Sequence, residues 1–132
     1  MIGNSDWDLT SGRNVKVVKK EGKYLAIPYD FDFSGIVHAD YAIPNPNYGL
    51  VSTKERTYLG FKEDLANLDQ TLAYFESKQD AIKEVIKKFK LLKGKYRQET
   101  TQYLKTFFEN IEDIQYRSKK IFMASKVEAQ ID

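Results

Sequence analysis

The amino-acid sequence predicts an α+β fold that is mostly helical, in which a short β-hairpin and a long loop pack on a bundle of three to four helices. Within residues 14–32, an apolar stretch at residues 15–18 and another at residues 24–27 flank a Lys/Glu/Gly turn, which is typical of a hairpin. Six of the seven Gly and all three Pro fall at or before Gly60, so the first part is expected to be irregular. After Lys62, apolar residues recur at three- and four-residue steps, the period of an amphipathic helix.

The hairpin is expected to turn at Glu21 and Gly22, between two apolar runs. Counting outward from a loop of two or three residues brings Asn14 opposite Tyr29 or Asp30, and the turn type decides between these registers. Either register makes Asn14 and Asp30 neighbours without any tertiary assumption.

Acidic residues follow the second strand of this hairpin. If the segment stays extended, alternation places Asp30 and Asp32 on one face and the neighbouring Phe side chains on the other. Two carboxylates about 7 Å apart repel by about 2 kcal/mol at an effective dielectric near 20. A divalent cation would offset this repulsion, and the oxygens of Asp and Asn suit magnesium. The competing interpretation is a solvated loop whose charges are screened by water and basic side chains.

A second motif lies upstream of the hairpin. The chain reads Gly-Asn-Ser-Asp at residues 3–6, and the second strand runs into Tyr-Asp-Phe-Asp at residues 29–32. An Asp in a loop, an Asn that opens a strand, a short hairpin and then an Asp-Phe pair follow the order of the protein-kinase active site. These residues resemble the divergent bacterial kinase-like proteins of the CotH spore-coat and HipA types. The resemblance covers about residues 1–35. It implies that the fold of the whole chain is kinase C-lobe-like, corresponding to the lower part of a kinase C-lobe.

The resemblance implies a role for each acidic position. Asp6 would be the catalytic Asp that orients or deprotonates the acceptor hydroxyl, and Asn14 and Asp30 would bind Mg²⁺ and, through it, ATP. Asp32 stands where ordinary kinases have Gly and would add a second carboxylate to the metal site. Ordinary kinases have four residues between the catalytic Asp and the Asn. Seven residues separate Asp6 from Asn14, so the loop between them must bulge if both keep these roles. Five residues separate Asp8 from Asn14, which makes Asp8 a rival for the catalytic position.

The function that the resemblance implies is ATP- and Mg²⁺-dependent phosphoryl transfer, with a nucleotide and an unknown phosphoryl acceptor as partners. A kinase also needs a glycine-rich loop and a strand Lys, both N-terminal to the catalytic loop. We therefore expect a fragment or truncated relative of a larger protein, which would not be active alone. A protein partner could cover the surface of the missing lobe. The alternative is a non-catalytic helical module for protein interaction.

The chain is expected to form a single partial domain with three regions. Residues 1–35 would hold the catalytic loop and the metal hairpin, residues 36–61 an activation-segment-like loop, and residues 62–132 the helical bundle. Residues 62–92 predict one long helix or two, because Ser77 could cap a second helix there. Gly94 is expected to end this run. Two further helices are expected, one over residues 96–108 and one around Ile114, Ile121 and Phe122.

Composition excludes several other classes of function. The net charge of +2 gives no strong field, so we expect no nucleic-acid partner. With no Cys there is no disulfide or thiolate site, and the single His38 cannot make a His-rich zinc site. No apolar run reaches membrane-spanning length, so we expect no membrane partner and a cytoplasmic location by default. The aromatic share of 14% predicts a core built largely from Phe and Tyr.

Overall fold

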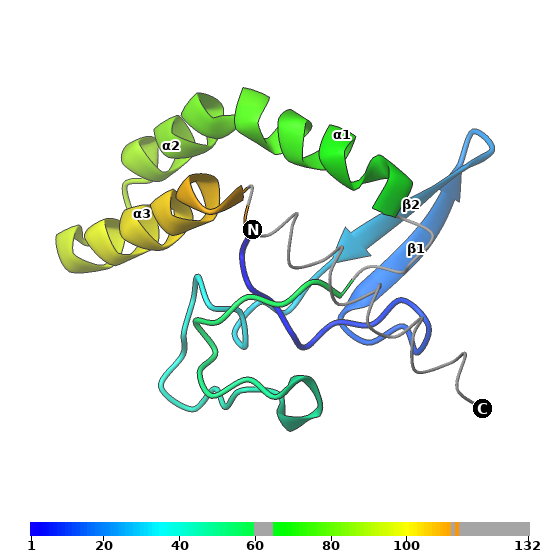
Figure 1. Ribbon diagram of the computed structural model, residues 1–132, viewed down its shortest axis with the longest axis horizontal. Coiled ribbons are helices and arrows are strands. Elements are labelled where there is room, and N and C mark those ends of the chain that lie inside the picture. The colour runs from blue at the N-terminus through cyan, green and yellow to red at the C-terminus, as the bar shows by residue number, and fades with distance from the viewer. Residues whose placement is uncertain (60–64, 112, 114–132) are drawn as a thin grey trace. The chain divides into compact units, whose positions relative to one another are not determined.

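A computed structural model describes residues 1–59, 65–111 and 113 of the chain (Figure 1). The described residues form a small α+β structure with three α-helices and a two-stranded antiparallel hairpin, which confirms the predicted fold class at this level. The chain divides into two compact units, Met1–Thr57 and Tyr58–Asp132. The elements, in chain order, are β1 (Val15–Lys20), β2 (Lys23–Pro28), the 3-10 turn η1 (Pro46–Tyr48), α1 (Leu65–Ser77), α2 (Gln79–Lys88) and α3 (Gly94–Glu109).

The hairpin of the first unit closes through the expected turn. Lys20 pairs with Lys23, which leaves Glu21 and Gly22 as a two-residue loop. Both loop residues have positive φ angles, 51° and 76°, which is the signature of a type I′ turn. The twist of this turn matches the twist of the strands that it joins, so a two-residue loop fixes the register without distortion.

The outer end of the hairpin settles the register that the sequence left open. Val15 pairs with Pro28, and the next amide outward, that of Tyr29, donates to the carbonyl of Asn14 at 3.0 Å. Asn14 therefore lies opposite Tyr29, and Asp30 is the next residue along. This is one of the two predicted registers.

The expectation of an extended segment after β2 is wrong. Asp30 has a φ of +57°, in the left-handed region that Asp tolerates better than most residues. The chain then turns, and both the amide and the hydroxyl of Ser34 donate to the carbonyl of Phe31. Strand alternation therefore does not set the directions of the Asp30 and Asp32 side chains.

The residues after this turn run alongside the start of the chain. Ser34 forms an antiparallel bridge with Asn4, and the amide of Gly35 donates to the carbonyl of Gly3 at 2.9 Å. Further along the long loop, Asn45 Nδ2 donates to the carbonyl of Ser5 at 3.2 Å. Ser34 is fully enclosed, with an exposed fraction of 0%, so this crossing is shielded from solvent. It holds the Gly-Asn-Ser-Asp segment against the chain that follows the hairpin.

In the second unit, the open question of one helix or two is answered by a break at Lys78. This residue has φ −100° and ψ 0°, so α1 and α2 are separate helices. Ser77 does not cap α2 as predicted, because its hydroxyl donates back to the carbonyl of Tyr74 at 2.7 Å. A Ser near a helix C-terminus has such carbonyls within reach, and this bond competes with capping.

The role predicted for Gly94 is also wrong. The helix α2 ends at Lys88, and Gly94 is the first residue of α3. The turn between the two helices is instead closed by Arg97. Its Nη1 donates to the carbonyls of Ile86 and Lys87, and its Nη2 donates to those of Phe89 and Leu92. A guanidinium can satisfy several carbonyls that a helix end leaves without partners, so no left-handed Gly is required.

The core of the second unit is mainly aliphatic. Its buried apolar side chains are Leu68, Leu72, Leu104, Phe107 and Ile111. Phe107 meets Phe75 edge to face, with ring centroids 5.8 Å apart. Among the described residues, Phe107 is the one aromatic side chain that is buried, so the prediction of a largely aromatic core is wrong for this part of the chain. Most of the Tyr rings are instead at the surface, where their hydroxyls can meet water. The final helix expected around Ile114 lies outside the described residues.

The four bonds of Arg97 predict a large effect of its removal. We expect Arg97→Ala to lower the free energy of unfolding of the helical unit by about 1–3 kcal/mol, because partly buried carbonyls lose a charged donor. Arg97→Lys should recover only a minor part, since an ammonium lacks the planar fork that reaches several acceptors. Urea denaturation followed by circular dichroism measures this. Lys95→Ala is the control, because Lys95 makes only a long, exposed contact of 3.9 Å to Glu99, and an equal loss in both variants would contradict the assignment.

Candidate functional site

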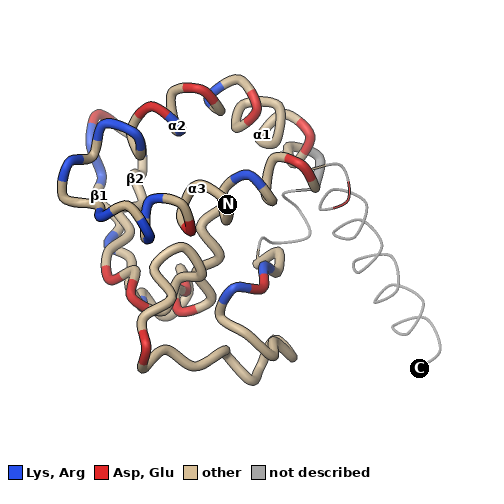
Figure 2. The backbone as a smooth tube through the Cα atoms, turned by 90° about the vertical axis from the view of Figure 1, so that its left-hand side faces the viewer, with Lys and Arg blue, Asp and Glu red and all other residues tan. Residues whose placement is uncertain are grey.

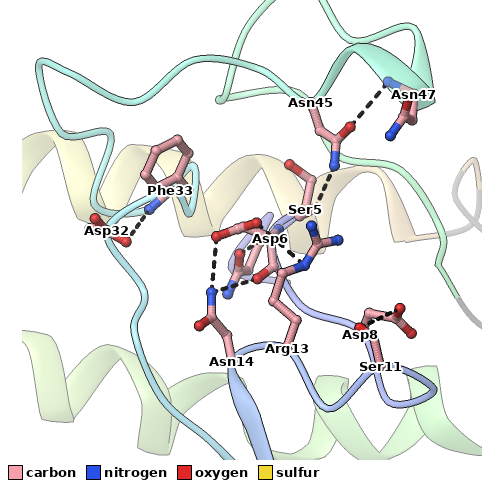
Figure 3. Close-up of polar contacts among 11 residues, drawn as sticks. Ser5, Asp6, Asp8, Ser11, Arg13, Asn14, Asp32, Phe33, Asn45 and Asn47 are labelled. Atoms are coloured by element: carbon pink, nitrogen blue, oxygen red, sulfur yellow. Dashed lines mark hydrogen bonds and ion pairs between the residues drawn. The ribbon is translucent and has the colours of Figure 1, made fainter.

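The centre of the candidate site is the contact between Asn14 and Asp6. Asn14 Nδ2 donates to the Asp6 carboxylate at 2.9 Å and to the Asp6 main-chain carbonyl at 2.7 Å. Figure 3 shows the amide nitrogen turned towards Asp6 and the amide oxygen turned away from it. Both atoms of Asp6 that contact Asn14 are acceptors, so the side-chain nitrogen of Asn14 must face them. The side-chain oxygen of Asn14 then remains available to bind a ligand.

The Asp6 carboxylate is fixed from several sides. The main-chain amide of Asp6 donates to the side-chain oxygen of Asn4 at 2.9 Å, which closes a local turn in the Gly-Asn-Ser-Asp segment. The carboxylate oxygen of Asp6 that does not accept from Asn14 lies 3.6 Å from Nε of Arg13. The side chain is one-third exposed, so it can still be approached from solvent. An anion held in one orientation at a half-open surface is suited to align or accept a proton from a hydroxyl.

The rival residue, Asp8, makes different contacts. One of its oxygens accepts from the amide and hydroxyl of Thr10 at 2.9 and 2.6 Å, and the other accepts from the hydroxyl of Ser11 at 2.8 Å. These bonds lower the pKa of Asp8 to about 2. Both oxygens of Asp8 serve its own turn, whereas Asn14 contacts Asp6. The geometry thus favours Asp6 over Asp8 for the position beside Asn14.

The extra residues between Asp6 and Asn14 form a small closed loop. Asp8 and Arg13 form an antiparallel bridge in which each amide donates to the other's carbonyl at 3.0 Å. Residues 9–12 project from this bridge as an exposed turn. Because the bridge closes the turn at its base, the extra residues do not separate Asp6 from Asn14.

The two acidic residues after the hairpin form a coupled pair. The Asp32 carboxyl group, through hydrogen bonding and through its charge, raises the pKa of Asp30, with a smaller contribution from the charge of Asp6. Asp32 instead accepts from the hydroxyl of Tyr41 at 2.9 Å and from the amide of Phe33 at 3.0 Å. The bond from Tyr41 is the main reason why the pKa of Asp32 is lowered. The surroundings of the pair therefore shift the two pKa values in opposite directions, that of Asp30 upwards and that of Asp32 downwards.

The donor atoms fit a hard divalent cation in type. Asp30, Asp32 and the amide oxygen of Asn14 are all oxygen donors, and Mg²⁺ needs only one or two protein carboxylates when water and phosphate complete its shell. Asp6 lies close enough to Asp30 for its charge to be felt there, which ties the two ends of the site together. Within the described residues, however, no group of three or more His, Cys, Asp or Glu side chains is arranged to hold a metal.

Two contributors were missed by sequence reasoning. Arg13 directly precedes Asn14 in the chain, so its place beside the site could have been inferred from adjacency alone. Tyr41 lies nine residues beyond Asp32 in the long loop, and no periodic pattern pointed to it. His38, in the same loop, lies 2.6 Å from the hydroxyl of Thr53, a contact within the loop itself.

Comparisons with models of protein families, with curated proteins and with solved structures find no match for this chain. The resemblance to CotH- and HipA-type kinase-like proteins is therefore an expectation from the motifs at residues 3–6 and 29–32 of the sequence.

The bonds to Asp8 predict an acid-dependent contribution to stability. Its pKa is lower in the folded chain than the ordinary 3.8, so the stabilisation is complete above about pH 4 and is lost as the pH falls towards 2. We expect Asp8→Asn to lower the melting temperature at pH 6 and to differ less from the parent chain at pH 2.5. Thermal unfolding across this range measures the effect. Asp40→Asn, which removes an exposed carboxylate of the same unit, should not reproduce it, and a difference for Asp8→Asn that stays constant with pH would contradict the expectation.

Proposed function

We propose that the Met1–Thr57 unit carries the catalytic-loop and metal-binding part of an ATP- and Mg²⁺-dependent phosphotransferase of the kinase-like type. The observation that carries the proposal is the pair of bonds from Asn14 to Asp6. They join the loop Asp to the residue that opens the hairpin, while the Asp30 and Asp32 pair follows the other strand. The residues that follow the kinase order in sequence are thus also neighbours in space.

Each residue has a definite task under this proposal. Asp6, oriented by Asn14, would align the acceptor hydroxyl and take up its proton. The oxygens of Asn14, Asp30 and Asp32 would hold Mg²⁺, which when bound neutralises charge on the phosphates of ATP. Tyr41 would orient Asp32 and lower its pKa through its hydrogen bond.

The proposal also has consequences for partners. Phosphoryl transfer depends on positioning and on charge stabilisation from several sides of the phosphates. The unit would therefore act together with a further polypeptide segment that covers the nucleotide. The phosphoryl acceptor is not specified by the residues of this site. No helix among the described residues is long and apolar enough to cross a membrane. Because ATP is the proposed phosphoryl donor, a cytoplasmic location is part of the proposal.

A second candidate function is a non-catalytic module for protein interaction. It is favoured by one specific observation, the exposed apolar side chains of Val85 and Phe89 on the helical unit. Large apolar side chains grouped at a surface are typical of binding sites for other proteins.

The metal site gives a direct test of the first proposal. We expect the chain to bind Mg²⁺ together with a non-hydrolysable ATP analogue, with heat that isothermal titration calorimetry detects. Asp30→Asn should weaken this binding about tenfold or more, because the site loses a charged ligand. Asn14→Ala should also weaken it, since it removes a ligand and the donor that orients Asp6.

Asp40→Asn is the matched control, because it removes one exposed negative charge from the same unit without touching the site. Heat that is absent in the parent chain, or that survives Asp30→Asn unchanged, would remove the metal-site proposal. Equal weakening by Asp30→Asn and Asp40→Asn would indicate a general charge effect and would also contradict it.

A further inference from the structure

The outer edge of β1 is an open edge of the two-stranded sheet. Tyr29 donates its amide to the carbonyl of Asn14, so these two residues form a hydrogen-bonded pair at the open end of the hairpin. Bonded and non-bonded pairs alternate along an antiparallel ladder, which makes Val17 and Lys19 members of non-bonded pairs. Their N–H and C=O groups therefore point away from β2. Among the described residues, nothing outside the hairpin bonds to these groups.

The outer edge of β2 is less suited to receive a further strand. By the same alternation, its outward groups belong to Tyr24 and Ala26. The next outward position is Pro28, which has no N–H to donate. In contrast, β1 contains no Pro, and five of its six residues are exposed. A strand added to this hairpin would therefore bind along β1.

Basic and apolar side chains share one face of β1. Every second residue of a strand lies on the same face, as do residues directly opposite each other in the ladder. Lys16, Val18 and Lys20 thus lie on one face, together with Leu25 and Ile27 of β2. The apolar members are 44%, 47% and 50% exposed, in the order Val18, Leu25 and Ile27. This face of β1 therefore presents the order basic, apolar, basic to solvent.

The basic charge of the hairpin is not offset by acidic neighbours (Figure 2). The two strands and their turn contain four Lys and one acidic residue, Glu21, which lies in the turn. Within the part of the chain that the structure describes, none of these Lys side chains forms an ion pair. Lys16 and Lys19 instead lie 5.8 and 5.5 Å from the ring centroids of Tyr29 and Tyr24. Such contacts are weak at an exposed surface, so these ammonium groups are free to pair with an anion.

A second copy of β1 is a poor occupant of this edge. Paired antiparallel about its own centre, β1 would bring Lys16 opposite Lys19 or Lys20. Like charges directly opposite each other destabilise a strand pair, and Lys on an edge strand is a common protection against self-pairing. The same side chains attract a strand that carries carboxylates. The charge of the edge thus selects an acidic partner.

We propose that β1 binds an extended acidic peptide segment of another protein, which adds to the hairpin as a third, antiparallel strand. Main-chain bonds to Val17 and Lys19 would hold any extended peptide, and the side chains would select among peptides. The bound segment would place carboxylates opposite Lys16 and Lys20 and an apolar side chain opposite Val18. Residues two apart on a strand are about 7 Å apart, so the selected pattern is acid-x-apolar-x-acid. The inference does not depend on the proposed phosphotransferase function.

The probe is a synthetic peptide with this pattern, acetyl-Thr-Thr-Glu-Thr-Val-Thr-Glu-Thr-Thr-amide, carrying a fluorescent label. We expect the full chain to bind it saturably, with a dissociation constant below about 1 mM in a polarisation titration. Two control peptides keep the length of the probe. One replaces both Glu by Gln, and the other is an isomer in which the two Glu are adjacent, so that they would lie on opposite faces of the strand. Both should bind about fivefold or more weakly, because cross-strand charge pairs are lost.

A charge reversal tests the edge itself. Lys16→Glu/Lys20→Glu should weaken binding of the probe about tenfold or more, because like charges then face each other. Lys90→Glu/Lys93→Glu is the matched control, since it changes the net charge equally at exposed positions of the helical unit and should leave binding unchanged. Circular dichroism checks that both double variants are folded.

Main-chain readouts separate strand addition from general charge attraction. In the parent chain, bound probe should slow the hydrogen exchange of the Val17 and Lys19 amides, because these amides gain acceptors. The Val18 amide, which belongs to a bonded pair of the hairpin, should change little. Val17→Pro removes an outward N–H without changing the charge or a bonded pair, and it should abolish binding of the probe.

Each contrary outcome overturns a stated part of the proposal. A probe that does not bind saturably overturns the whole. Equal binding of the probe and its isomer, or equal weakening by the two double variants, also overturns it, because the attraction is then a general charge effect. Exchange of the Val17 and Lys19 amides that is unchanged by bound probe overturns strand addition, and so does a folded Val17→Pro variant that binds like the parent chain.

Discussion

The contact between Asn14 and Asp6 is the constraint on which the candidate site depends. One amide group bonds both the carboxylate and the main-chain carbonyl of the loop Asp, so it fixes the side chain and the backbone together. The other bridges near it are main-chain ones, between Asp8 and Arg13 and between Asn4 and Ser34. The hairpin in turn depends on its two-residue turn, because the register set at Gly22 determines that Asn14 is the residue at its open end.

Much of the architecture was predictable from local signals. Glu21 and Gly22 sit between apolar runs, and the turn formed there with one of the two anticipated registers. The helical stripes after Lys62 also gave α1, α2 and α3, because a period of three to four residues is a property of the chain itself. The choice between one helix and two needed the structure, since the break at Lys78 has no side-chain cap to announce it.

The errors arose where one side chain or one backbone conformation replaced the general rule for its segment. Gly94 was expected to end a helix, but Arg97 reaches back from α3 to the same carbonyls and makes a Gly unnecessary. The segment after β2 was expected to alternate as a strand, but a left-handed Asp30 turns it. The two carboxyl groups still influence each other, because Asp32 raises the pKa of Asp30. The metal-ligand roles of these residues remain a proposal.

The bridge between Asp8 and Arg13 has a consequence for how such sites are recognised. Residues 9–12 stand outside the bridge, so the chain could gain or lose residues there while both ends of the turn stay where they are. The interval between the loop Asp and the following Asn would then be an evolutionary variable rather than a fixed mark of the fold. A sequence pattern with a fixed number of residues between the Asp and the Asn would miss chains in which this turn has a different length. A search for the spatial contact between an Asp and an Asn, as in Asp6 and Asn14, would find them.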